Sequence, residues 1–131
     1  MKTALVVDTD LGFLFWLAGL LAAAGYQAYP AESVADAELL LNRIEEGIEL
    51  LVVDPRLYRA ADLAVNLRQI QPSIIILALE PESGASSAEL PGVKARLVRP
   101  DPANESSTLV WRENLLKHLT GADDNPPILW Q

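Results

Sequence analysis

A short run of branched apolar residues, Leu50-Leu51-Val52-Val53, ends abruptly on Asp54 near the middle of the chain. An apolar run of this length, followed by a turn-forming Pro55, is typical of a strand buried on both faces of a parallel sheet. In such sheets, ligands bind in the crevice beyond the carboxyl ends of the strands. Asp54 is therefore a candidate functional residue, and the competing interpretation is that it only starts a turn or caps the next helix.

A second buried run, Ala4 to Val7, also ends on an acidic residue, in the triplet Asp8-Thr9-Asp10. Asp10 is well placed to cap a helix over residues 11–24, which Gly25 would end. Further strands are predicted at 26–29, 50–53, 73–79 and 94–99, and further helices at 34–44, 60–70 and 106–119. Residues 80–90, rich in Ser, Gly, Glu and Pro, predict at most a short helix.

This alternation predicts an α/β fold: a three-layer, doubly wound, five-stranded parallel sheet of the flavodoxin-like order 2-1-3-4-5. The first and third strands are neighbours in that order, so Asp8 and Asp54 would lie at adjacent strand ends. Two carboxylates in that position repel each other unless a proton or a cation lies between them. A hard divalent ion such as Mg²⁺ is the natural ligand for such a pair.

Length and charge restrict the remaining possibilities. The 131 residues predict one domain over 1–120, with 121–131 as a tail or linker. The net charge of −8 disfavours direct binding to nucleic acid. The chain has no Cys and one His, which leaves no thiolate or histidine metal site. Residues 11–25 carry no charged side chain, but 15 residues fall short of the roughly 20 that cross a membrane. Acidic residues precede this segment where a signal peptide is basic, so we expect a cytoplasmic protein without a membrane anchor.

Four motifs follow one another along the chain: Val6-Val7-Asp8, Gly25-Tyr26, Val52-Val53-Asp54-Pro55-Arg56-Leu57 and Leu97-Val98-Arg99-Pro100. Over residues 2–120 they resemble the receiver domain of bacterial response regulators, the CheY-like family. The resemblance implies that Asp54 is a phosphoacceptor, and that Asp8, Asp54 and the backbone carbonyl of Arg56 bind Mg²⁺. It also implies a histidine kinase or phosphotransfer protein as the partner, and a signalling role rather than an enzymatic one.

Five positions depart from the family pattern; two of them are Tyr58 and Arg96, and the other three belong to the expected phosphorylation site. Thr9 stands where the family has a second acidic residue that binds the metal, and Ala78 stands where it has a Ser or Thr that contacts the phosphoryl group. Arg99 replaces the usual Lys, and its planar fork is not equivalent to a compact ammonium group. We therefore expect an atypical or degenerate receiver with at most weak Mg²⁺ binding. Arg99 is also expected to reach Asp54 and to stabilise one conformation without phosphate.

The predicted first helix is apolar on every side, which indicates burial on more than one face. Leu14, Leu17 and Leu21 would face the core, and Phe13, Trp16 and Leu20 would form a second stripe beside them. The second stripe predicts a protein interface, in a homodimer or with a helical partner. Alternatively, the C-terminal tail or the last helix, with Trp111, covers it within one chain.

Two other functions fit parts of the sequence. A phosphorylation-independent interaction or dimerisation module would use only the first helix. A hydrolase of the haloacid-dehalogenase type also uses a strand-end Asp, but it requires a second Asp two residues later, where Arg56 stands. The hydrolase is therefore the less favoured of the two.

Overall fold

The computed structural model describes residues 1–81, 89–100 and 104–120. The strands are β1 (Lys2–Val7), β2 (Tyr26–Ala31), β3 (Leu50–Val53), β4 (Ile75–Glu80) and β5 (Ala95–Val98). The helices are α1 (Leu11–Ala23), α2 (Val34–Leu41), α3 (Ala60–Ile70) and α4 (Glu105–Thr120). All strand pairs are parallel, in the order β2-β1-β3-β4-β5. The predicted fold is confirmed.

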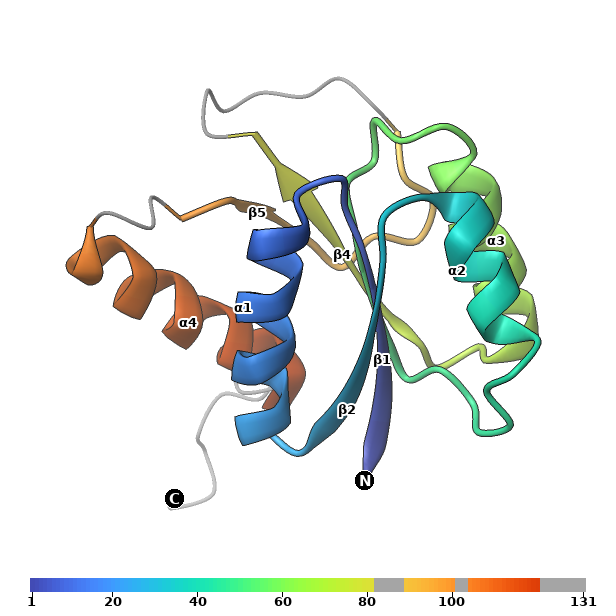
Figure 1. The fold of residues 1–131 in the computed structure, drawn as a ribbon, viewed down its shortest axis with the longest axis horizontal. Coiled ribbons are helices and arrows are strands. Elements are labelled where there is room, and N and C mark those ends of the chain that lie inside the picture. Colours follow the sequence, from blue (N-terminus) through green and yellow to red (C-terminus); the bar gives the residue numbers. More distant parts are fainter. Residues whose placement is uncertain (82–88, 101–103, 121–131) are drawn as a thin grey trace, which may run out of the picture.

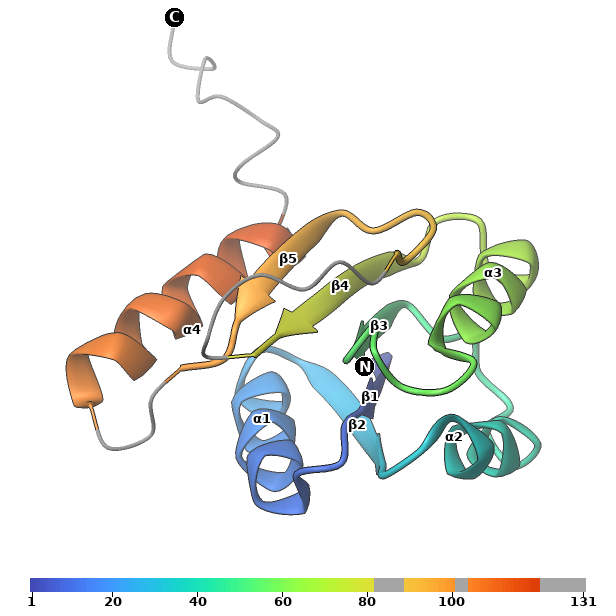
Figure 2. The ribbon, with the colours of Figure 1, turned by 90° about the horizontal axis from the view of Figure 1, so that it is seen from above.

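The helices cover both faces of the sheet (Figures 1 and 2). Helices α1 and α4 pack on one face, and α2 and α3 pack on the other. Alternate residues of each strand enter two separate cores: Val52 and Leu77 lie in the core under α1 and α4, whereas Val53 and Ile76 lie in the core under α2 and α3. Burial on both faces explains why β1, β3 and β4 consist of continuous apolar residues rather than alternating ones.

Side-chain caps set the starts of α1 and α2. The carboxylate of Asp10 accepts a hydrogen bond from the Phe13 N–H at 3.1 Å, and this N-cap starts α1. Ser33 caps α2 in the same way, accepting from the Asp36 N–H at 3.1 Å. Helix α2 ends at Leu41, three residues before the predicted end. Strand β2 continues through Pro30 to Ala31, because an edge strand tolerates a missing N–H.

The region between β4 and β5 falls largely outside the described residues, since 82–88 are not among them. Residues 89–94 form a turn without helix. The predicted tail, 121–131, also lies outside the described part. Within the described residues, none of the helices combines the length and apolar content needed to span a bilayer.

Strand register places the two acidic strand ends side by side. Val7 pairs with Val53 across β1 and β3, and Asp8 and Asp54 each come one residue later. Their backbone N–H groups extend the two ladders: Asp8 donates to the Ala31 carbonyl and Asp54 to the Val7 carbonyl, both at 3.1 Å. The backbone of both residues is therefore fixed by the sheet itself.

Candidate functional site

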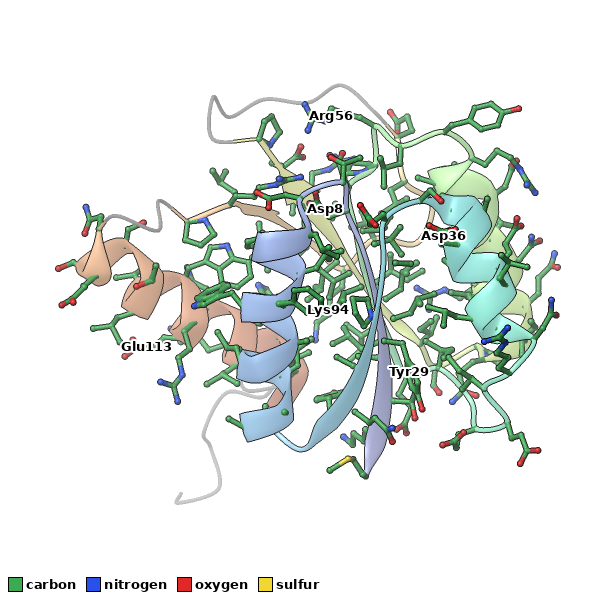
Figure 3. All side chains as sticks on the ribbon, in the orientation of Figure 1. Asp8, Tyr29, Asp36, Arg56, Lys94 and Glu113 are labelled. Carbon is green, nitrogen blue, oxygen red and sulfur yellow. The ribbon has the colours of Figure 1, made fainter. Side chains whose placement is uncertain are left out.

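Asp8 and Asp54 form the centre of the site at the carboxyl end of the sheet. Asp8 is fully buried and Asp54 is 3% exposed. One oxygen of Asp8, Oδ1, accepts a hydrogen bond from the Asp10 N–H at 3.0 Å. Figure 3 shows Asp8 and Arg56 at this end of the sheet. A pair of buried carboxylates requires compensating positive charge nearby.

Arg56 supplies part of that charge directly to Asp54. Its Nε donates to Asp54 Oδ1 at 3.0 Å, and a terminal nitrogen donates to Oδ2 at 2.7 Å. Its backbone N–H adds a third hydrogen bond to Oδ1 at 2.9 Å. This is the two-pronged geometry in which guanidinium groups bind carboxylates best. The side chain of Arg56 is itself 49% exposed, so it covers Asp54 from the solvent side.

Arg99 supplies charge from the end of β5. It follows β5, and its backbone N–H extends the sheet by donating to the Glu80 carbonyl at 3.1 Å. One terminal nitrogen forms an ion pair with Asp8 Oδ2 and lies 3.2 Å from Asp54 Oδ2. The guanidinium carbon lies 5.5 Å from the centre of the Phe13 ring, a cation–π contact. Arg99 thus bridges the two carboxylates and ties them to α1.

The two carboxyl groups respond oppositely to this environment. Burial raises the pKa of Asp8 above its ordinary value, and the Asp10 N–H and Arg99 offset only part of that effect. Burial also acts to raise the pKa of Asp54, but the hydrogen bonds and charge of Arg56, together with Arg99, outweigh it and lower the pKa. Asp54 is therefore held as a carboxylate by its arginine partners.

The side chains do not fit a Mg²⁺ ion in addition to these two guanidinium groups. Both oxygens of Asp54 already accept hydrogen bonds from Arg56, and Arg99 occupies the space between Asp54 and Asp8. In the described ranges, there is no group of three or more His, Cys, Asp or Glu side chains that could hold a metal ion. Thr9 lines a separate hollow with Ser33. The predicted Mg²⁺ site, including the Arg56 carbonyl, stays a prediction.

Comparison with known proteins identifies the fold. No protein-family model matches the chain, and no curated protein matches its sequence. Solved structures do match. A response regulator receiver domain from Clostridium thermocellum is 18% identical, with a TM-score of 0.63, covering 92% of this chain and 98% of its own. The chemotaxis response regulator CheY4 of Vibrio cholerae is 19% identical, with a TM-score of 0.64, covering 90% of this chain and 98% of its own.

A third structure, at 27% identity and a TM-score of 0.61, is a response regulator from Burkholderia pseudomallei that contains a phosphorylated aspartic acid, a calcium ion and citrate. The match covers 96% of this chain and 76% of that one. The chain has the fold of a response regulator receiver domain. The resemblance seen in the sequence is therefore confirmed at the level of fold.

Within this receiver fold, β4 spans Ile75–Glu80, whereas the sequence predicted a strand over 73–79. Ala78 pairs with Val53, the residue before Asp54, and is buried in the core under α2 and α3. Its methyl group offers no donor to the site. Two residues later, the buried Glu80 forms an ion pair with Arg96 at 2.8 Å. The sequence analysis did not identify Glu80, although an acidic residue ending a third buried strand was a signal of the same kind as Asp8 and Asp54.

The side-chain role of Arg56 was also missed. The resemblance assigned only its backbone carbonyl, whereas its guanidinium is the main partner of Asp54. An Arg two residues after a strand-end Asp was the available signal. Arg99, in contrast, reaches Asp54 as the sequence led us to expect.

The predicted interface residues on α1 are partly covered by α4. The ring centre of Trp111 lies 5.5 Å from that of Trp16 and 6.1 Å from that of Phe13. Trp16 nevertheless remains 39% exposed, and Phe15, which was not among the predicted interface residues, is 60% exposed. The last helix therefore covers part of the stripe, as the alternative predicted. Whether Phe13, Trp16 and Leu20 contact a partner stays a prediction.

Proposed function

We propose that this chain is a pseudo-receiver: a receiver-fold signalling domain that acts by binding a partner protein and does not depend on phosphorylation. The single observation that carries this proposal is that the guanidinium of Arg56 occupies both oxygens of Asp54, while Arg99 joins Asp54 to Asp8. A receiver domain changes conformation when a negatively charged phosphoryl group is added to this carboxylate. Here the protein's own arginines already neutralise it.

Chemistry at the site supports this proposal. Phosphoryl transfer to a carboxylate needs an exposed oxygen and a cation that neutralises the developing charge. The Asp54 oxygens are paired and Asp54 is 3% exposed. The resemblance assigns the position of the phosphoryl-contacting hydroxyl to Ala78, which has none. The partner would be a protein of the same signalling system, such as a histidine kinase or phosphotransfer protein, in the cytoplasm. Helix α1, which has no charged side chain, is the surface we assign to it.

A second candidate is an atypical phosphoreceiver, and the exposure of Arg56 favours it. Because half of that side chain is in solvent, it can rotate away and uncover an oxygen of Asp54. The phosphorus of a phosphohistidine would then bond to this oxygen as its bond to the imidazole nitrogen breaks, leaving a neutral imidazole after protonation. The phosphorylated aspartic acid of the Burkholderia pseudomallei protein is the precedent.

Beryllofluoride, which mimics a phosphoryl group on Asp, separates the two candidates. It is added with Mg²⁺ to ¹⁵N-labelled protein, and the amide signals of Asp8, Asp54 and Arg99 are followed by NMR. The pseudo-receiver predicts no shift at millimolar concentrations. Shifts in the natural sequence that disappear in Asp54→Asn would overturn the pseudo-receiver and establish the phosphoreceiver.

The variant Arg56→Ala is the matched positive control. It removes the two side-chain hydrogen bonds to Asp54 and leaves the backbone bond of residue 56 in place. If Arg56 is what closes the site, the variant should respond to Mg²⁺ with beryllofluoride while the natural sequence does not. If the amide signals of Arg56→Ala also do not shift, combining this variant with Arg99→Lys tests whether Arg99 alone closes the site.

A further inference from the structure

A shallow groove lies between residues of α1 and α4. Figure 2 shows these two helices on the face of the sheet opposite α2 and α3. We call this groove the α1–α4 groove; its volume is about 490 Å³, and it is lined by Phe15, Trp16, Gly19, Leu20, Ala23, Thr108, Leu109 and Arg112. Its rim exposes large apolar side chains, with Phe15 60% and Leu109 58% exposed. An exposed cluster of apolar side chains of this kind is typical of a binding site.

A second hollow, of about 420 Å³, lies at the C-terminal ends of the same two helices. It is lined by Lys2, Ala24, Tyr26, Leu116 and Leu119, among others. The two hollows follow one another along the helices, since Ala23 and Arg112 line the first and Ala24 and Leu116 line the second. The second hollow is lined by Leu119, the neighbour of Thr120, which is the last described residue.

The chain continues from that point with eleven residues, Gly121 to Gln131. Seven of them precede the apolar triplet Ile128-Leu129-Trp130. An extended chain covers about 3.3 Å per residue, so the triplet can lie up to about 26 Å from Thr120. Arg112 is eight helical residues back from Thr120, or about 12 Å along α4. The segment that precedes the triplet is therefore long enough for the triplet to reach the α1–α4 groove.

Charge and stiffness favour the same placement. Asp123 and Asp124 come early in this segment, where they would pass Lys2 beside the second hollow, and the groove itself contains the cation Arg112. Pro126 and Pro127 favour an extended backbone and so lower the entropy lost on docking. A second copy of the chain is a weaker candidate occupant. Each copy carries a net charge of −8, and a tethered segment has an effective concentration in the millimolar range.

We propose that Ile128-Leu129-Trp130 docks in the α1–α4 groove of its own chain and covers Phe15 and Leu109. The docked segment lies over the helix that the proposed function assigns to a partner, so a partner of α1 must displace it. That last consequence rests on the proposed function, whereas the docking itself is independent of the state of Asp54.

Paramagnetic relaxation tests this docking in the full chain. Because the chain contains no Cys, Gln131→Cys gives a single attachment point for a nitroxide label. Docking predicts strong broadening of the amide signals of Gly19, Ala23, Leu109 and Arg112, and none for α3, on the other face of the sheet. The matched control is the same labelled chain with Leu129→Ser and Trp130→Ser, in which broadening at the groove should fall to the level of α3.

Two results would overturn the proposal. One is uniform weak broadening of α1, α3 and α4, which means that the triplet does not dock. The other is broadening that transfers between molecules when ¹⁵N-labelled unmodified protein is mixed with spin-labelled unenriched protein, which assigns the groove to a second copy. Neither result depends on the beryllofluoride titration, so failure of the docking and failure of the pseudo-receiver proposal are distinguishable.

Discussion

Arg99, the residue after β5, forms an ion pair with the fully buried Asp8, the residue after β1. The two residues belong to strands that are not neighbours, because β3 and β4 lie between them in the sheet. The pair therefore spans the carboxyl end of the sheet, and Arg99 also forms an ion pair with Asp54, which follows β3. It fixes the relative position of three strand ends in a way that backbone hydrogen bonds alone do not.

Replacing Arg99 with Met should destabilise the fold strongly. The variant leaves Asp8 buried without a cationic partner, and breaking one side of a buried pair costs about 3–5 kcal/mol. Urea unfolding at pH 7 measures the difference. Arg43→Met, at an exposed position, is the control and should change stability by less than about 0.5 kcal/mol.

The double variant Asp8→Leu with Arg99→Met tests the same relationship from the other direction. Removing both charges leaves no unpaired ion, so it should recover a large part of the loss seen in Arg99→Met. A double variant as unstable as the sum of the two single variants would show that the residues act independently, and would contradict the pairing.

Asp54→Asn should change how stability depends on pH. The pKa of Asp54 is lower in the folded state than its ordinary value of 3.8, so its ionisation stabilises the fold at neutral pH and that contribution is lost as pH falls through the folded pKa. The free energy of unfolding of the natural sequence should exceed that of Asp54→Asn by about 3 kcal/mol at pH 7, which is the low end of the cost of breaking a buried ion pair. This difference in the free energy of unfolding should become smaller as pH falls below about 4.

Asp8 acts with the opposite sign. Its raised pKa means that the folded state retains the proton more strongly, so its contribution is present at low pH and is lost as pH rises through the raised pKa. The charge of Asp54 contributes to raising the pKa of Asp8, so Asp54→Asn would also change the Asp8 titration. Both proteins are therefore compared in an Asp8→Asn background, in which Asp8 does not titrate. A difference in the free energy of unfolding that stays constant between pH 7 and pH 3 would contradict the lowered pKa of Asp54.

The sequence predicted those features of the fold and site that depend on local patterns, and missed those that depend on tertiary contacts or loop conformation. The strand-end positions of Asp8 and Asp54 were predictable, because each ends a continuous apolar run and the strand order made the two runs neighbours. The pairing of Arg56 with Asp54 was not predictable, because the direction of an exposed side chain depends on the backbone of the loop after β3. The early end of α2 at Leu41 was also missed, because the apolar pattern continues to Ile44.

The aromatic contacts between α1 and α4 show the same limit. Apolar spacing correctly placed Leu14, Leu17 and Leu21 in the core. It did not decide whether Trp16 meets Trp111 or a partner, since almost a hundred residues separate them and the contact depends on how two helices pack on one sheet face. Alternatives of that kind are decided by tertiary structure rather than by periodicity.

Substitutions of Trp111 should separate its packing from its polar group. Trp111 is 6% exposed, and its Nε1 is buried without a hydrogen-bond partner among the described residues. Trp111→Ala should lose about 3–5 kcal/mol, because it removes the contacts with Phe13 and Trp16. Trp111→Phe keeps a ring and removes the unpaired N–H, so it should lose less than about 1.5 kcal/mol. Equal losses in urea unfolding would contradict this prediction, because they would mean that a phenyl ring does not replace the packing of Trp111.

Two Gly→Ala substitutions on α1 and its C-terminal turn should have opposite signs. Gly25 has a φ of 92°, in the left-handed region, where a Cβ costs about 1–2 kcal/mol, so Gly25→Ala should destabilise the fold. Gly19 lies inside α1, where an added Cβ meets nothing within 4 Å, and Gly19→Ala should stabilise by up to about 1 kcal/mol through helix propensity. Thermal unfolding followed by circular dichroism measures both shifts. The same chemical change is made in both variants, so a shift of the same sign would show that backbone conformation is not what distinguishes these two glycines.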